Sequence, residues 1–364
     1  MQWVHDEIYL KDTTLFSNIC GRSNKLNNAM DYVSLAHGNG GRFMRELIED
    51  VFAHHLSNPI LNIQADAVQL PFDAQDEDTV LMFTTDGFTV QPLEFPGGSI
   101  GSLAVHGTVN DLAVAGATPL YLSLNAIIEE GLEVALLERV IANLAEAANA
   151  AGVQVAAGDT KVVGRGEGGG LYLATTGIGR RLKSIDIGLN RIREGDSILV
   201  SGPIGDHGIA VLLAREQFGL RGDVRSDSAS VLPLTQTLHG FSGLRFMRDP
   251  TRGGLATVLN EIHRATGLGV RIQDEAIPVR DPVNAVCEML GYDPLYLACE
   301  GRVVAVIAED QAEEALHAWR ALGDGQDAAI VGRLTSDQHV ILETELGGER
   351  LLEELEDDPL PRIC

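Results

Sequence analysis

The sequence predicts a soluble protein of the α+β class with two domains. The chain has 364 residues, enough for two domains of ordinary size, and an apolar fraction of 45% supports packed cores. Both halves mix short β-prone runs with amphipathic helical segments, and neither shows a short-period repeat. We expect a leader of residues 1–30, an N-terminal domain of residues 31–183, a C-terminal domain of residues 184–346, and a flexible tail of residues 347–364.

Charge and cysteine content exclude several classes of protein. The formal net charge of −25, from 27 basic and 52 acidic residues, argues against binding to nucleic acid or an anionic membrane. No apolar run has the length of a membrane span, and the polar N-terminus does not resemble a signal peptide. The cysteines form no CxxC pair, so neither a zinc site nor a disulfide framework is indicated. We expect a cytoplasmic protein.

The first chemical signal is the glycine-rich segment Ala36–Arg42, which precedes a helical pattern at residues 43–51. Gly38, Gly40 and Gly41 could present backbone N–H groups to an anion at the start of this helix. The segment is neither a Walker loop nor GxGxxG, and a flexible turn before a helix explains it equally well.

Two aspartates follow in the first domain. The β-prone run Thr79–Thr85 predicts a strand that ends at Asp86, where a carboxylate beside glycine could hold Mg²⁺ or simply form a turn. Residues 99–115 predict a helix with Ser99 as a possible cap. Asp111 lies in the apolar face of that helix, where a charge is costly unless it is paired or coordinates a metal. Asp111 is therefore the better candidate.

The next helix is predicted at residues 133–150 from its apolar spacing. It leads into a strand at residues 153–157, which ends before Asp159 and Lys161. Lysine could bind a phosphate and aspartate a metal at this position. A surface ion pair of little energetic value accounts for the same two residues.

In the second half, a predicted strand at residues 196–201 is followed by a glycine-rich turn before a helix. Further along, Asp249 offers another carboxylate to a cation, and Arg248 and Arg252 on either side could clamp phosphate oxygens. The paired glycines that follow could let the backbone approach a ligand.

A last carboxylate comes at Glu300, which we place at the end of a strand formed by Leu295–Cys299. A strand at residues 302–308 and a helix at residues 310–322 should follow. Two further strands are expected at residues 328–334 and 339–343.

These acids share a setting, because each stands next to glycine or at the end of an apolar run. They are Asp86, Asp111, Asp159, Asp249 and Glu300. Several carboxylates brought together repel one another unless a metal holds them. The pattern predicts a magnesium–nucleotide site without a Walker loop.

The chain ends at Cys364, after an acidic run at residues 353–358 and two prolines. The acidic run should be solvated and mobile, while the prolines stiffen the final residues. A frayed terminus with an incidental cysteine is the alternative. The combination with the carboxylates favours a thiol carried on a movable arm.

Six segments together resemble the HypE family of hydrogenase maturation proteins, from about Tyr32 to Cys364. This family belongs to the superfamily of aminoimidazole ribonucleotide synthetase and selenophosphate synthetase. The segments are LAHGNGGR, TTDGF, VNDLAVAGATP, AAGDTKVV, RDPTRGG and the terminal PRIC.

The resemblance implies a two-domain aminoimidazole ribonucleotide synthetase-like fold and a homodimer that pairs through its N-terminal sheets. It implies that the carbamoyltransferase HypF loads a carbamoyl group on Cys364. ATP and Mg²⁺ then serve to dehydrate this S-carboxamide to a thiocyanate, and the cyano group passes to iron on the HypC–HypD complex for the [NiFe] hydrogenase.

The resemblance also implies roles for single residues. Lys161 would stabilise developing charge, Glu300 would be the base, and Cys364 the acceptor. The expected metal ligands are Asp86, Asp111 and Asp249. The expected nucleotide-binding residues are Gly38, Gly40, Gly41, Asp86, Asp111, Asp159, Lys161 and Arg252.

Three alternatives remain open at this point. A selenophosphate synthetase should carry a reactive cysteine near the first glycine-rich segment, and residues 36–42 contain none, while Cys20 lies far upstream. A purine-pathway synthetase would not require a terminal cysteine. A non-catalytic carrier would only present Cys364, and it would not need the carboxylate set.

Overall fold

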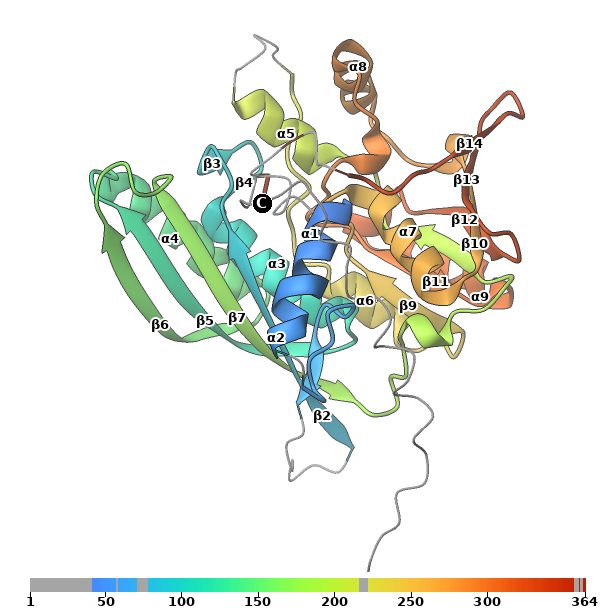
Figure 1. Ribbon diagram of the computed structural model, residues 1–364, viewed down its shortest axis with the longest axis horizontal. Coiled ribbons are helices and arrows are strands. Elements are labelled where there is room, and N and C mark those ends of the chain that lie inside the picture. Colours follow the sequence, from blue (N-terminus) through green and yellow to red (C-terminus); the bar gives the residue numbers. More distant parts are fainter. Residues whose placement is uncertain (1–40, 57, 71–77, 216–221, 357–359, 361–362) are drawn as a thin grey trace, which may run out of the picture. The chain divides into compact units, whose positions relative to one another are not determined.

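Two mixed β-sheets with their covering helices organise the chain (Figure 1). The computed structural model describes residues 41–56, 58–70, 78–215, 222–356, 360 and 363–364, all within one unit of residues 35–364. Within these ranges no helix is long and apolar enough to cross a membrane. The predicted α+β class is confirmed.

The first sheet contains, among the described residues, five strands in the order β1, β2, β7, β5, β6. Strands β5 and β6 are parallel, and the other neighbours are antiparallel. The bounds are β1 Val68–Leu70, β2 Thr79–Phe88, β5 Thr118–Glu129, β6 Gln154–Val163 and β7 Leu171–Leu182. A small hairpin, β3 Glu94–Phe95 and β4 Gly98–Ser99, precedes the helices.

Two helices cover one face of this sheet (Figure 1). Helix α3 (Ile100–Val114) packs against β2 and β7, and α4 (Val134–Ala150) packs against α3. The predicted helices at residues 99–115 and 133–150 are thus confirmed, with Ser99 at the N-cap of α3. Asp111 lies on α3 and faces the sheet, so the position of this acid follows directly from the helix.

The second sheet has seven strands within the described ranges, in the order β14, β13, β10, β12, β8, β11, β9. Strands β10 and β13 are parallel, and the other pairs are antiparallel. The bounds are β8 Ser197–Val200, β9 Leu244–Arg248, β10 Gly269–Gln273, β11 Val304–Ile307, β12 Ala329–Thr335, β13 Val340–Glu343 and β14 Glu349–Leu351. Strand β14 falls within the segment that we expected to be the flexible tail.

Helices cover both faces of the second sheet. Helix α7 packs on one face, and α6 and α9 pack on the other. The helices of this half are α5 Asp206–Ala214, α6 Leu232–Leu238, α7 Gly254–Thr266, α8 Asp281–Leu290 and α9 Glu309–Arg320. The remaining helical segments are α1 Gly41–Leu47, the π-helix Ile48–Ala53, α2 His54–Leu56, and the 3₁₀ turns Leu189–Arg191, Asp274–Ala276, Pro294–Tyr296 and Gly323–Gly325.

The predicted strand at Leu295–Cys299 is wrong. Residues Pro294–Tyr296 form a 3₁₀ turn, and the next strand begins at Val304. The side chain of Asp293 accepts a hydrogen bond from the Leu295 N–H at 3.0 Å, which starts the turn. Proline has a fixed φ and no N–H for a ladder, so the local chemistry favours the turn over the apolar run.

Two other predicted strands continue past their expected ends. Asp86 lies inside β2, and Asp159 and Lys161 lie inside β6. In both cases pairing with a long neighbouring strand extends the ladder beyond the local apolar run. The glycines that suggested a strand end are therefore accommodated within the sheet.

Asn110 joins the first half of the chain to the second. Its Nδ2 donates to the carbonyl oxygens of Ala229 and Glu300 at 3.0 and 3.1 Å. Its Oδ1 accepts from the N–H of Val231 at 2.9 Å. The side chain is buried, so these three bonds fix the backbone of Glu300 against α3.

We expect Asn110→Ala to lower the free energy of unfolding by about 2–4 kcal/mol, because it leaves buried backbone groups without partners. Urea denaturation measures this change. The control is Asn149→Ala, an exposed asparagine near the end of α4, which should change stability by less than about 0.5 kcal/mol. Equal effects of the two substitutions would show that the Asn110 bonds do not hold the halves together.

Candidate active site

Three buried or half-buried aspartates meet where the two halves join. Asp66, Asp111 and Asp249 each offer one carboxylate oxygen, and these oxygens all lie within 4.8 Å of one another. Asp66 precedes β1, Asp111 lies on α3, and Asp249 follows β9. The cluster lines a cavity of about 320 Å³. The cavity is also lined by Gly41, Thr84, Asp86, Arg248, Arg252 and Glu261.

Hydrogen bonds and an ion pair hold the cluster in place. Thr84 Oγ1 donates to Asp111 Oδ2 at 2.8 Å. Arg248 Nη1 lies 2.8 Å from Asp66 Oδ1, and the same guanidinium donates to the carbonyl oxygen of Gln64 at 2.7 Å. Arg248 therefore fixes the loop that carries Asp66. Arg248 also lines the cavity, and the prediction that it clamps phosphate oxygens stays a prediction.

Ionising all three carboxylates would destabilise the folded protein, because they lose hydration and repel one another. Burial raises the pKa of Asp66 to about 6, although the charge of Arg248 opposes this. Burial and the charge of Asp66 raise the pKa of Asp249 to about 7. The pKa of Asp111 is also raised, by burial and by its acidic neighbours. A divalent cation would relieve these charges, and carboxylate oxygens are the ligands that Mg²⁺ prefers.

Asp86 lies beside the cluster and not within it. Its Oδ1 accepts from the Gly87 N–H at 2.7 Å and lies 3.6 Å from Arg252 Nη2. Asp86, expected as the third metal ligand, is outside the group of three described above. The group contains Asp66 instead, and the prediction that Asp86 binds the metal stays a prediction.

Glu300 lies close to the same charges but deeper in the protein. It is 2% exposed, and its Oε1 has no hydrogen-bond partner among the described residues. Burial raises the pKa of Glu300 well above its usual value, and the charges of Asp249, Asp227 and Asp86 add to this effect. Arg252 acts in the opposite direction. A buried carboxyl group with a raised pKa is suited to accept a proton.

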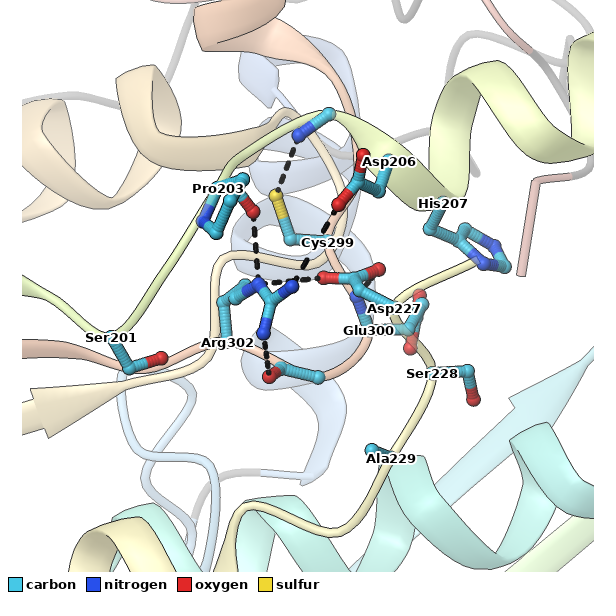
Figure 2. A network of polar contacts seen from close by, with 12 residues as sticks. Ser201, Pro203, Asp206, His207, Asp227, Ser228, Ala229, Cys299, Glu300 and Arg302 are labelled. Atoms are coloured by element: carbon cyan, nitrogen blue, oxygen red, sulfur yellow. Dashed lines mark hydrogen bonds and ion pairs between the residues drawn. The ribbon is translucent and has the colours of Figure 1, made fainter. Parts of the chain in front are cut away.

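A buried network supports the Glu300 backbone (Figure 2). Asp227 Oδ1 accepts from the Glu300 N–H at 3.2 Å. Arg302 Nε lies 3.5 Å from Asp227 Oδ2 and donates to the Pro203 carbonyl at 2.9 Å. A Cβ at Gly301 would overlap the carbonyl of Asp227, so glycine allows the two segments to approach this closely. Arg302 thus holds the loop that orients Glu300.

The end of the chain lies in the same region. A terminal carboxylate oxygen of Cys364 accepts from the Thr89 N–H at 3.0 Å and from Thr89 Oγ1 at 3.2 Å. Leu360 and Ile363 are both 3% exposed and belong to a core shared by the two halves. The charge on Cys364 is the largest of several effects that raise the pKa of Arg252. The terminal cysteine is therefore held inward.

Helix α1 forms another wall of the cavity. The Arg42 N–H donates to the Leu355 carbonyl at 2.9 Å, and Arg42 Nη2 lies 2.8 Å from Glu356 Oε1. Gly41 lines the cavity as expected for a nucleotide-binding residue. Gly38 and Gly40 lie outside the described residues.

Asp159 and Lys161 are not brought to the cluster within one chain. Both side chains are exposed on the edge strand β6 and form an ion pair of 2.5 Å with each other. Glu300, in contrast, is buried at 2% exposure.

The paired glycines before α7 have a different role from the one we expected. A Cβ at Gly254, where φ is +59°, would lie 2.5 Å from the Leu297 carbonyl oxygen. The close approach is thus to the chain itself and not to a ligand. It places α7 against the turn that precedes Glu300.

Asp66 and Thr89 were not among the site residues predicted from the sequence. Asp66 follows no apolar run and stands beside no glycine, so the pattern that identified the other acids does not include it. Arg248 gave an indirect indication of Asp66, because a buried arginine needs an acidic partner. Thr89 has no distinguishing local pattern.

Comparisons with known proteins agree with this fold. Residues 64–181 match the N-terminal domain and residues 193–345 the C-terminal domain of AIR synthase related proteins. Carbamoyl dehydratase HypE of Azotobacter vinelandii is 46% identical over 335 residues, which cover 91% of this chain and 97% of the relative. HypE of Escherichia coli K12 is 43% identical over 336 residues, covering 92% of this chain and all of the relative.

Solved structures extend the likeness to the fold. A HypE–HypF complex matches with a TM-score of 0.79 and 42% identity, covering 85% of this chain and 99% of the solved chain. Hydrogenase maturation protein HypE in complex with ATP matches with a TM-score of 0.75 and 44% identity, covering 92% of this chain and 100% of the other.

The two sheets, the junction of acids and these matches define an AIR synthase-related enzyme. Within that class, the chain belongs to the HypE family of carbamoyl dehydratases, which act in hydrogenase maturation. The family predicted from the sequence motifs is thereby confirmed.

Without divalent cations, we expect the free energy of unfolding to fall as the pH rises from about 4 to about 7. Asp66 and Asp249 have folded pKa values of about 6 and about 7, against about 3.9 in an unfolded chain. The folded state therefore binds more protons across this window, and each group contributes up to about 1.4 kcal/mol per pH unit. Urea denaturation in EDTA at several pH values measures the slope, and Mg²⁺ should restore stability at pH 7.5.

Asp66→Asn should reduce both the pH slope and the stabilisation by Mg²⁺. The matched control is Asp274→Asn, which changes an exposed acid and should leave both quantities as they are in the unmodified protein. If Asp66→Asn and the unmodified protein show the same slope and the same response to Mg²⁺, the cluster does not bind the cation.

Proposed function

We propose that the chain uses ATP and Mg²⁺ to convert an S-carboxamide on Cys364 to an S-cyanate. The cyano group then becomes a cyanide ligand of iron in a [NiFe] hydrogenase. The inward position of Cys364 carries this proposal, because it brings the terminal cysteine to Arg252 beside Asp86 and Glu300. Membership of the HypE family supports the same reaction.

The chemistry requires an activated oxygen and a base. The carboxamide oxygen is a poor leaving group until it carries the γ-phosphoryl group of ATP. Both N–H protons must then be lost, and the oxygen departs with phosphate to leave S–C≡N. Bound Mg²⁺ would neutralise the phosphate charges and orient the γ-phosphoryl group. Asp66, Asp111 and Asp249 would hold it, with Asp86 beside them.

Glu300 is the proposed base for the last N–H proton. Its raised pKa makes it a strong acceptor once it is ionised, and the positive charge of Arg252 favours the ionised form. The carboxyl group is enclosed, so water does not compete for the proton. Arg252 would also stabilise negative charge on the departing phosphate.

Asp159 and Lys161 enter this proposal through a second copy of the chain. Strand β6 is an edge strand with exposed side chains, and neighbouring apolar residues on β5 and β6 are also exposed. They are Tyr121, Ile127, Val155 and Val162. A homodimer formed through the first sheet would cover these residues. It would carry Lys161 of one copy to the phosphate site of the other.

The proposed partners follow from the reaction. HypF would supply the carbamoyl group, and a HypC–HypD complex would receive the cyano group. The solved HypE–HypF complex supports the first step. Both exchanges require Cys364 to leave the inward position, since its backbone is held there by Thr89.

Two other activities would use parts of the same site. A carrier that only presents Cys364 would not need Glu300 or the acid cluster. A phosphotransferase like selenophosphate synthetase would need the cluster but not the terminal cysteine. The inward placement of Cys364 beside the acids favours the dehydratase over both.

We expect intact mass to show a carbamoyl adduct on the protein after loading by the carbamoyl-donating partner HypF and removal of free nucleotide, and loss of one water only after Mg²⁺–ATP is added. Glu300→Gln should form the same adduct but dehydrate it at least about 100-fold more slowly, because it lacks the base. Cys364→Ala should form no adduct at the terminus. An adduct that never loses water would support the carrier, and dehydration at the full rate by Glu300→Gln would remove the base assignment.

A mixing experiment tests whether Lys161 acts in the site of its own chain or in that of the second copy. Chains with Lys161→Ala and chains with Cys364→Ala should each be inactive alone, because one lacks the lysine and the other the acceptor. Refolded together in equal amounts, half of the dimers are mixed and each has one complete site, so about a quarter of the full activity should return. Absence of recovery in confirmed mixed dimers would place Lys161 in the site of its own chain.

A further inference from the structure

His207 binds the last peptide group of the chain. This residue is the second of α5, is 0% exposed, and points away from the Arg302 network in Figure 2. Its Nε2 lies 2.8 Å from the carbonyl oxygen of Ile363. A carbonyl oxygen only accepts hydrogen bonds, so Nε2 carries the proton.

A second hydrogen bond fixes this tautomer. Nδ1 of His207 lies 2.8 Å from Ser226 Oγ, and since Nδ1 has no proton, the serine hydroxyl donates. The same oxygen accepts from the Ser228 N–H at 3.0 Å. Ser226 is itself anchored, because its N–H donates to the Pro96 carbonyl at 2.8 Å. The chain of donors therefore runs in one direction and ends at Ile363.

The surroundings keep the imidazole neutral and still. Burial lowers the pKa of His207, and the charge of Arg215 acts in the same direction, while Asp227 opposes both. The Phe95 ring meets the imidazole edge to face at 5.4 Å. In the neutral form with the proton on Nε2, Ser226 Oγ accepts from the Ser228 N–H and donates to Nδ1, while Nε2 donates to Ile363.

Residues from the two halves bind the Ile363 carbonyl oxygen and the terminal carboxylate of Cys364. Thr89, which follows β2, binds the Cys364 oxygen, and His207, on α5, binds the Ile363 oxygen. The Cys364 side chain is attached between these two fixed points. A shift of the chain end by one residue would take both oxygens away from these donors and displace the Cys364 side chain by about the length of one residue.

We propose that His207, held in its Nε2–H form by Ser226, is a positioning residue that sets the register of the chain end and places the Cys364 thiol at the active site. It does not touch the reacting atoms. This inference rests on the proposed function of Cys364. It adds that the His207 imidazole selects the inward position of the chain end by binding the Ile363 carbonyl oxygen.

The test compares substitutions that keep or remove the donor. In His207→Gln the amide nitrogen reaches about as far as Nε2, so the bond to Ile363 can form. In His207→Asn the amide is too short to reach Ile363 but can still contact Ser226. Both substituted side chains are polar and small enough to fit the space that the imidazole occupies, so both variants should fold. The control is His263→Asn, which removes another imidazole-to-carbonyl bond, to Leu268, remote from the chain end.

Two measurements distinguish a change in the position of the Cys364 thiol from a change in the dehydration step. The rate of iodoacetamide labelling at Cys364, located by peptide mass, reports how often the thiol is outside. Single-turnover dehydration of the carbamoylated protein at saturating ATP reports how often it is inside. For His207→Asn we expect labelling to be about tenfold faster and dehydration about tenfold slower, with unchanged ATP affinity.

His207→Gln should return both rates to within about threefold of the unmodified protein, and His263→Asn should change neither. Equal rates for His207→Asn and the unmodified protein would overturn the proposal. So would a His207→Gln protein as defective as His207→Asn, since that result indicates a requirement for shape alone. If the unmodified protein does not dehydrate its adduct, the proposed function fails, whereas the labelling rates still decide the role of His207.

Discussion

The structure depends on keeping several carboxylates buried where its two halves join. Such groups repel one another and lose hydration, so each needs a compensating partner. Arg248 compensates Asp66, and Arg252 compensates Asp86 and Glu300. Both arginines flank Asp249 in the sequence, so one short segment supplies an acid and the two cations around it. The remaining negative charge is what a bound cation would offset.

Site residues could be predicted from the sequence where their immediate neighbours in the chain distinguish them. Asp111 could be identified because it interrupts an apolar helical face, and Asp249 because arginines and glycines surround it. Asp66 could not, because its burial depends on Arg248 in the other half of the chain. Lys161 is exposed on β6 in a single chain, so the role proposed for it requires a second copy of the chain, which no local sequence pattern describes.

The bounds of the helices and strands likewise depend partly on neighbouring residues and partly on remote strands. Helices α3 and α4 follow from apolar spacing and from the residues that end them, and their predicted bounds are confirmed. Strand ends were less predictable, since β2 and β6 are extended by long neighbours beyond the apolar run. At Leu295 the apolar run itself misled, because Asp293 and Pro294 start a turn that no hydrophobic pattern reveals.

The inward position of the chain end is held by opposing terms of similar size. Burying Leu360 and Ile363 contributes about 1.5–3 kcal/mol each. Ordering each residue of a chain end costs about 1–2 kcal/mol. These terms nearly cancel over a short segment, so apolar burial alone does not decide the position. The hydrogen bonds from Thr89 and His207 then determine whether the thiol is inside. The proposed function requires the segment to reach the site and also to leave it, and a balance of this kind would allow both, because a few directional bonds select the register without making it permanent.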